Sequence, residues 1–217
     1  MGVLTKYLLD ITEKKIIAVD VDTESIIYLK NKYPGLNIIE GDILKLNLSE
    51  ITPEKIAIIG NFPYNISSQI LFKVLENKEK VPFIVGMFQK EVAERIASGP
   101  GNKEYGILSV LMQTFYDVEY VFSVDAQEFI PAPKIQSGVL LFKIKEYNLP
   151  FKEKLFFNVV KIAFNQRRKT LRNALKSLNV DVSGTESEKF LDKRAEQLSH
   201  EEFAILTGNI EMVKNKA

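Results

Sequence analysis

Short apolar runs alternate with helix-like stretches along the N-terminal part of the chain. The runs occupy residues 16–19, 36–39, 56–59 and 83–88, and residues 25–32 and 91–97 have the apolar spacing of helices. Apolar runs of this length predict strands that are buried on both faces of a parallel sheet. Their alternation with helices is typical of βαβ units. The pattern therefore predicts an α/β fold with a doubly wound, Rossmann-like sheet.

The later part of the chain has a different pattern. Residues 118–122 and 138–144 predict two further strands, and the second is expected to pair antiparallel near the sheet edge. Beyond residue 150, apolar positions recur with helical spacing only, and helices are expected over residues 186–194 and 201–206. We therefore predict two domains, an α/β domain over residues 1–147 and a small all-helical domain over residues 148–217.

Polar side chains stand at the ends of three predicted strands: Asp20, Asp42 and Asn61. Ligands of doubly wound sheets bind outside the carboxyl ends of the strands, so these residues are expected to face one ligand site. An acid after the second strand of such a fold accepts hydrogen bonds from ribose hydroxyls, the role predicted for Asp20. Asp42 would accept from an adenine amino group. A helix N-cap at Asp20 or Asp22 and a simple turn at Asp42 are the alternatives.

The third apolar run ends in the 61–64 motif, Asn61-Phe62-Pro63-Tyr64. The Asn61 amide and the Pro63 backbone offer carbonyl oxygens, and Tyr64 offers a flat aromatic face. Two acceptors and a stacking surface suit a planar ring that carries an exocyclic amine. Asn and Pro also punctuate ordinary strand-to-helix turns. The place of the motif at the end of an apolar strand in an α/β pattern favours the binding function.

A proline-rich loop separates the last two predicted strands, and it contains Phe129, Pro131 and Pro133. Proline restricts its own backbone and that of the preceding residue, so the loop is expected to hold Phe129 in a fixed pose. An aromatic side chain on a rigid loop is a candidate stacking platform for a base. Packing of Phe129 into the core beneath the loop is the alternative, and for a single Phe it is the commoner outcome.

The net charge of +1 conceals an uneven distribution. Residues 152–176 carry eight basic side chains and one acidic one, so this segment is +7 and the rest of the chain is −6. A charged helix face is usually just solvated. At the centre of this segment, however, no acid lies within four residues of the basic side chains on a predicted helix, which favours contact with a nucleic-acid phosphate backbone. We call these side chains the basic cluster: Arg167, Arg168, Lys169 and Arg172.

Composition narrows the remaining classes of protein. The chain has no cysteine and one histidine, which excludes disulfides and thiolate metal sites and predicts no metal centre. No apolar run approaches the ~20 residues that span a bilayer, and the first residues do not resemble a signal peptide. We expect a cytoplasmic monomer without a membrane partner, in which His200 caps the last helix or packs beside it.

Five segments occur together and in a fixed order: residues 61–68 (NFPYNISS), 89–92 (QKEV), 105–110 (YGILSV), 129–134 (FIPAPK) and 164–170 (FNQRRKT). With them the chain resembles the ribosomal RNA adenine dimethyltransferase family over essentially its whole length. The 61–64 motif alone is similar to that of amino-methyltransferases that use S-adenosylmethionine. Residues 164–170 are similar to the small-subunit branch of the family, as against the erythromycin-resistance methyltransferases of large-subunit RNA.

The resemblance implies that two neighbouring adenines in a hairpin loop of small-subunit rRNA are methylated at N6. It implies S-adenosylmethionine as the cofactor, bound by four residues: Gly2, Asp20, Asp42 and Asn61. The catalytic residues that it implies are Asn61, Pro63, Tyr64 and Phe129. The two oxygens would stabilise the charge that develops on N6, while the two rings hold the base in line with the methyl group. The basic cluster would bind the rRNA of the immature small ribosomal subunit.

One departure from the family concerns its cofactor motif, Gly-Pro-Gly-x-Gly-x-Leu-Thr after the first strand. Residues 1–5 (MGVLT) match only the second half of that motif, so the first strand and the first two glycines have no counterpart here. We expect this chain by itself to bind S-adenosylmethionine weakly, and the complete protein to be active. A non-catalytic RNA-binding or ribosome-assembly factor and a large-subunit rRNA adenine methyltransferase are the alternative functions.

Overall fold

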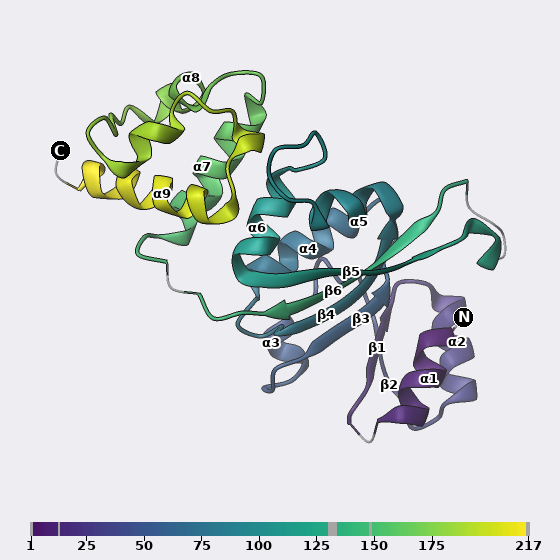
Figure 1. The fold of residues 1–217 in the computed structure, drawn as a ribbon. Coiled ribbons are helices and arrows are strands. Elements are labelled where there is room, and N and C mark those ends of the chain that lie inside the picture. Colours follow the sequence, from purple (N-terminus) through teal and green to yellow (C-terminus); the bar gives the residue numbers. More distant parts are fainter. Residues whose placement is uncertain (1, 13, 130–133, 148, 216–217) are drawn as a thin grey trace.

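The computed structural model describes residues 2–12, 14–129, 134–147 and 149–215 (Figure 1). The first elements are α1 (Val3–Ile11), β1 (Ile17–Asp20), α2 (Thr23–Lys32), β2 (Asn37–Glu40), α3 (Leu48–Ile51), β3 (Ala57–Asn61), α4 (Ser67–Glu76), β4 (Phe83–Gln89) and α5 (Lys90–Ala97). They are followed by α6 (Ile107–Phe115), β5 (Tyr116–Val124), η1 (Ala126–Glu128), β6 (Ser137–Ile144), α7 (Glu153–Asn165), α8 (Leu171–Ala174), η2 (Leu175–Leu178), η3 (Glu186–Phe190), η4 (Ala195–Gln197) and α9 (His200–Lys214). The four apolar runs of the N-terminal part thus all form strands.

The strands form two sheets, with no backbone pairing between the sheets in the described residues. β1 and β2 pair in parallel, with Asp20 opposite Glu40. The larger sheet has the order β3-β4-β6-β5, in which β3 and β4 are parallel and β6 is antiparallel to both of its neighbours. Parallel strands joined through helices confirm the predicted Rossmann-like α/β fold. The predicted antiparallel strand is β6, which lies next to the edge strand β5.

Burial is concentrated in the centre of the larger sheet. Every second residue of β4 is buried, and so are the first four residues of β6. No residue of β1, β2 or β3 is fully buried. The expectation that these three apolar runs are covered on both faces is therefore wrong. Their positions explain the difference, because β3 is an edge strand of its sheet and β1 and β2 form a sheet of only two strands.

Helices α4, α5 and α6 gather on one face of the larger sheet (Figure 1). α6 also contacts α7 and α9, so it connects the sheet to the C-terminal helices. At this junction Lys78 Nζ lies 2.6 Å from Glu153 Oε2 and 4.9 Å from the centroid of the Phe115 ring. The Lys78 side chain is buried, so the ion pair and the cation–π contact compensate for its desolvation.

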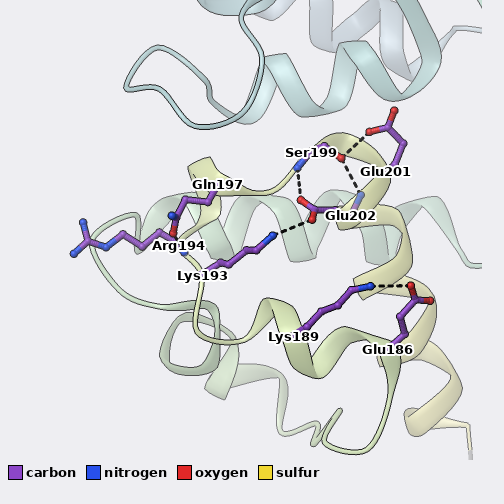
Figure 2. Close-up of polar contacts among 8 residues, drawn as sticks. All are labelled: Glu186, Lys189, Lys193, Arg194, Gln197, Ser199, Glu201 and Glu202. Atoms are coloured by element: carbon purple, nitrogen blue, oxygen red, sulfur yellow. Dashed lines mark hydrogen bonds and ion pairs between the residues drawn. The ribbon is translucent and has the colours of Figure 1, made fainter.

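The C-terminal part is helical, as predicted, but its elements differ from the expected ranges. The predicted helix over residues 186–194 is wrong, because only the short 3-10 helix η3 forms there, whereas α9 extends the last helix to Lys214. α9 begins with a capping box, in which the Glu202 N–H donates to Ser199 Oγ at 3.2 Å and the Ser199 N–H donates to Glu202 Oε2 at 2.9 Å (Figure 2). Lys193 Nζ donates to the other oxygen of Glu202 at 3.0 Å.

Ser199 is the N-cap of α9, and His200 is the first residue of this helix. The His200 side chain packs against Lys145 and does not cap the helix. Its Nε2 atom lies 3.2 Å from Lys145 Nζ and 3.0 Å from Glu201 Oε1. Burial and the Lys145 charge both lower the pKa of His200. None of the helices in the described ranges is both long enough and apolar enough to cross a membrane.

Candidate functional site

The 61–64 motif is fixed to the larger sheet by its one buried side chain, that of Phe62. A Cβ added at Gly60 would lie 2.8 Å from the Phe62 ring, and one added at Gly86 would lie 2.7 Å from it. Gly60 and Gly86 are register partners in β3 and β4, so the ring lies over a surface made by two adjacent glycines. The Phe62 ring also meets the Phe88 ring edge-on, with centroids 5.4 Å apart at 77°. Because Phe62 points into the core, its neighbours Asn61 and Pro63 are left exposed.

The backbone of the motif makes a turn into α4. The Ile66 N–H donates to the Pro63 carbonyl at 3.1 Å, and Ser67 Oγ donates to the Tyr64 carbonyl at 3.1 Å. The strand-to-helix turn is therefore present together with the exposed polar groups. The Phe62 carbonyl accepts no backbone hydrogen bond among the described residues. It is a further candidate acceptor, which the sequence did not indicate.

Tyr64 is half-buried, and its hydroxyl lies 2.6 Å from the hydroxyl oxygen of Ser137. Ser137 is fully buried at the start of β6, between Gln89 of β4 and Val124 of β5. This contact thus joins the 61–64 motif to β6, the strand that follows the proline-rich loop. No sequence pattern indicates this contact, since Ser137 is an ordinary residue at a strand end.

Phe129 follows η1 in the connection between β5 and β6. This connection projects beyond the two strands (Figure 1). Its side chain is half-buried and is not a member of the hydrophobic core, so the alternative of a core plug is not supported. Gln136 Nε2 donates to Asp125 Oδ1 at 2.6 Å, and Lys90 Nζ donates to Gln136 Oε1 at 2.9 Å, so the two ends of the loop are joined to each other and to the start of α5. Pro131 and Pro133, the residues expected to stiffen the loop, lie outside the described residues.

Acidic side chains gather at the carboxyl ends of β1 and β2. Asp20 Oδ1 accepts from the Asp22 N–H at 3.0 Å, and Asp42 Oδ1 accepts from the Leu44 N–H at 2.9 Å. The second carboxylate oxygen of each has no hydrogen bond within the described part of the chain. Asp22, and not Asp20, is the N-cap of α2, and the hydrogen bonds from Ser25 lower the pKa of its carboxyl. Asp20 and Asp42 therefore retain acceptors for a ligand.

One further acid belongs to this acidic edge, and Gly2, the N-cap of α1, lies against Leu29 of α2. Glu40 lies opposite Asp20 in the β1–β2 register and accepts a hydrogen bond from Thr23 Oγ1 at 3.2 Å, a contact that the sequence did not predict. Gly2 has a φ of 66°, and a Cβ at this position would lie 2.8 Å from Leu29 Cδ2. Only glycine meets both conditions without strain. Position 2 therefore requires glycine because of its backbone conformation and its packing against Leu29.

The sequence predicted that the basic cluster lies on one helix, and this prediction is wrong. α7 ends at Asn165, so Arg167, Arg168 and Lys169 form the turn before α8, and only Arg172 is helical. The Gln166 side chain holds this turn by donating to the Ala174 carbonyl at 2.9 Å.

The basic cluster is also partly neutralised by acids that are distant in the sequence. Arg167 Nε lies 3.5 Å from Glu196 Oε2, and Arg172 Nε lies 3.1 Å from Asp192 Oδ1. Arg167 further donates to the Lys103 carbonyl at 2.6 Å and thereby joins the C-terminal helices to the loop before α6. Arg168 is exposed and makes no side-chain hydrogen bond or ion pair in the described ranges.

The predicted site residues thus form three separate groups. The acidic edge lies on β1 and β2, the 61–64 motif and Phe129 lie at one end of the larger sheet, and the basic cluster lies with α7 and α8 at the far end of the molecule from α1 (Figure 1). No hydrogen bond or ion pair joins one group to another among the residues that the structure describes. Each group can contact a different kind of ligand group. The acidic edge has acceptors for hydroxyl and amine donors, the 61–64 motif and Phe129 have aromatic rings for stacking, and the basic cluster has positive charges for phosphates.

Comparison with known proteins gives three findings. The family described as "Ribosomal RNA adenine dimethylase" matches residues 1–207 of the chain. The "Ribosomal RNA small subunit methyltransferase A" of Cytophaga hutchinsonii is 57% identical over 210 residues, 95% of this chain and 81% of that protein; the protein of the same name from Flavobacterium johnsoniae is 57% identical over 215 residues, 97% and 82% of the two chains. A dimethyladenosine transferase from Plasmodium falciparum has a crystal structure that matches with a TM-score of 0.82 at 28% identity, covering 99% of this chain and 87% of that one.

Proposed function

Because the chain belongs to the ribosomal RNA adenine dimethylase family, we propose that it transfers methyl groups to N6 of adenines in small-subunit ribosomal RNA. Its relatives named small subunit methyltransferases favour this substrate over large-subunit RNA. The observation that carries the proposal is the complete 61–64 motif at the carboxyl end of β3. There the buried Phe62 fixes a turn that exposes Asn61 and Pro63 beside the Tyr64 ring.

The chemistry of adenine explains why these groups are needed. The N6 lone pair is delocalised into the ring, so N6 is a weak nucleophile. Hydrogen bonds from N6–H to the Asn61 side-chain oxygen and to a backbone carbonyl of the motif would favour a tetrahedral nitrogen and the positive charge that develops on it. The Pro63 carbonyl is one candidate for this acceptor, because it accepts from the Ile66 N–H with one lone pair and keeps the other free. The Phe62 carbonyl is the second candidate. The methylated nitrogen is acidic enough to lose its proton to water, so no side chain is needed as a base.

The two rings of the site would hold the base. Stacking of adenine on Tyr64, with Phe129 as a second platform, would orient N6 toward the methyl donor. The adenine must be unpaired or flipped, because N6 cannot be reached in a paired base. Two neighbouring adenines in a hairpin loop meet this condition, and we propose them as the target.

S-adenosylmethionine is the methyl donor that family membership implies, and the acidic edge fits its nucleoside. Asp20 and Glu40 face each other in register, and both offer carboxylate oxygens to ribose hydroxyls, while Asp42 offers one to the adenine amino group. Family membership implies that the Gly2 backbone would contact the methionine part, and the Asn61 side chain would face the same group from the larger sheet. When bound, S-adenosylmethionine supplies the sulfonium methyl group.

We propose that residues 148–217 form the RNA-binding domain and residues 1–147 the methyltransferase domain. The basic cluster supports this role, with Arg168 as its strongest candidate because its charge has no partner in the described ranges. The partner would be the rRNA of the immature small ribosomal subunit. Arg168→Glu should weaken RNA binding and lower the slope of log affinity against log salt by about 0.7–0.9 for each phosphate that the side chain no longer neutralises. An unchanged slope would remove Arg168 from the RNA interface.

Asn61→Ala tests the methyl-transfer proposal directly. Loss of a polar group that stabilises transition-state charge costs about 100- to 1000-fold in rate, so methylation of undermethylated small subunits should collapse while RNA binding is retained. Asn65→Ala is a matched control, since Asn65 is also exposed and lies just outside the motif. If Asn61→Ala methylates as fast as the parent protein, the proposed site is wrong. Both variants are made in the complete protein, and if the complete protein itself binds these subunits without methylating them, it is instead an RNA-binding assembly factor.

A further inference from the structure

We propose that Ser137 is a positioning residue that fixes the Tyr64 ring through its hydroxyl group. The proposal rests on the methyltransferase function proposed above and adds a residue to it. Its basis is the 2.6 Å contact between Tyr64 Oη and Ser137 Oγ, which joins two elements that are far apart in the sequence. No other polar partner of Ser137 Oγ is found in the described part of the chain.

Ser137 is a rigid point of attachment. It is fully buried, and its backbone is paired on both sides, with Gln89 of β4 and with Val124 of β5. A residue in a central strand with neighbours on both edges has little freedom to shift. The hydroxyl oxygen of Ser137 is therefore held in place by the sheet itself.

Tyr64, by contrast, needs an external tether. It lies in the turn between β3 and α4, and its ring is half exposed. Ser67 Oγ holds the Tyr64 backbone through the carbonyl at 3.1 Å, but that contact leaves the side-chain torsions free. The contact with Ser137 holds the opposite end of the side chain. With both ends held, the plane of the ring is set before a base arrives.

The Tyr64 hydroxyl and the Tyr64 ring thus have separate roles. Since the hydroxyl is engaged by a buried serine, it acts as a tether, and the ring face is the part that contacts the base. Removing the oxygen alone should then have the same effect from either side of the contact. Tyr64→Phe and Ser137→Ala should each reduce the rate to the same modest extent, whereas loss of the ring in Tyr64→Ala should be far more severe.

The test is a double-mutant cycle of Tyr64→Phe and Ser137→Ala in the full chain, measured as methylation of undermethylated small subunits. Each single variant should lower kcat about three- to tenfold with KM for the subunit unchanged, as expected when about one neutral hydrogen bond is removed. The double variant should be no slower than the slower single variant, because both changes break the same contact. Tyr64→Phe keeps the experiment decisive if Ser137→Ala folds poorly, since it removes the contact from the half-exposed side.

Ser123→Ala is the matched control, because Ser123 Oγ makes the same kind of contact with Tyr120 Oη, at 2.7 Å, but within β5 and with no residue of the 61–64 motif. It should leave kcat unchanged. Full activity in both Tyr64→Phe and Ser137→Ala, multiplied effects in the double variant, or a change in KM alone would each overturn the proposal. Asn61→Ala, measured in parallel, distinguishes a failure of the Ser137 proposal from a failure of the proposed methyl-transfer site. If it is inactive while Ser137→Ala is normal, only the role of Ser137 is refuted, and if it is active, the methyl-transfer site itself is refuted.

Discussion

Gly86→Ala places a methyl group between two buried rings. The added Cβ would lie 2.7 Å from ring atoms of both Phe62 and Phe88, whereas ordinary contacts to a Cβ are 3.4–4 Å. Each ring must therefore move about 0.7 Å away from the new Cβ, and neither has space to do so, because Phe88 is fully buried and Phe62 is 7% exposed. Overpacking of this kind costs about 1–3 kcal/mol in the free energy of unfolding.

Gly35→Ala is the control for the backbone effect of the same substitution. Replacing glycine reduces the entropy of the unfolded chain and stabilises a protein by about 0.4–1 kcal/mol where the native conformation allows it. A Cβ at Gly35 meets no atom within 4 Å, so this effect should stand alone there. The difference between the two variants should then be about 1–3 kcal/mol. In urea this corresponds to a difference in midpoint of about 0.4–1 M.

Gly86→Ala should also lower the rate of methylation. Phe62 belongs to the 61–64 motif, so a displaced ring displaces Asn61 and Tyr64 with it. A shift approaching 1 Å in a positioning group lowers a rate by up to about 100-fold. Methylation by Gly86→Ala should therefore fall about 10- to 100-fold under conditions where the protein is still folded. Equal midpoints and equal rates for Gly86→Ala and Gly35→Ala would refute the packing argument for the motif.

Two further predictions concern stability. Because burial and Lys145 lower the pKa of His200, the unfolded chain binds the proton more tightly; stability should be full above the usual histidine pKa of about 6.5 and should fall below it. His200→Gln should remove this fall between about pH 7.5 and about pH 5.5 in urea midpoints, and an unchanged pH profile would contradict it. Glu153→Gln should destabilise more than Lys78→Met, by about 1–2 kcal/mol, because it leaves a buried ammonium unpaired, whereas methionine keeps the contact with the aromatic rings. The reverse order in denaturation midpoints would refute this.

The sequence could predict the elements that depend on local pattern. The apolar runs formed strands, and Asp20, Asp42 and Asn61 stand at or just beyond strand ends, because a strand's length and its terminating residues are encoded within a few positions. That β1, β2 and β3 are only partly buried could not be predicted in this way. Burial depends on which strands become neighbours, and that is decided by the whole sheet.

The residues that support the site could not be predicted from the sequence either, because they come together only in the folded chain. Phe62 needs Gly60 and Gly86 beneath it, and these two glycines meet only through the register of β3 with β4. No acid lies within four positions of the basic cluster in the sequence, whereas Glu196 reaches Arg167 across the fold. The end of α7 before this cluster was not predicted either, because local propensity is a weak guide to where a helix ends in a folded protein.

The division of the strands into two sheets has a consequence for local stability. A sheet of two four-residue strands is marginal on its own, and α1 contributes no buried residue to it. This unit should open more readily than the core of β4 and β6, so its amide hydrogens should exchange faster with solvent. Asp20 and Glu40 belong to the weak unit, and the 61–64 motif belongs to the larger sheet. A nucleoside bound at the acidic edge would slow exchange in β1 and β2 selectively, and the ordering of this unit would offset part of its affinity.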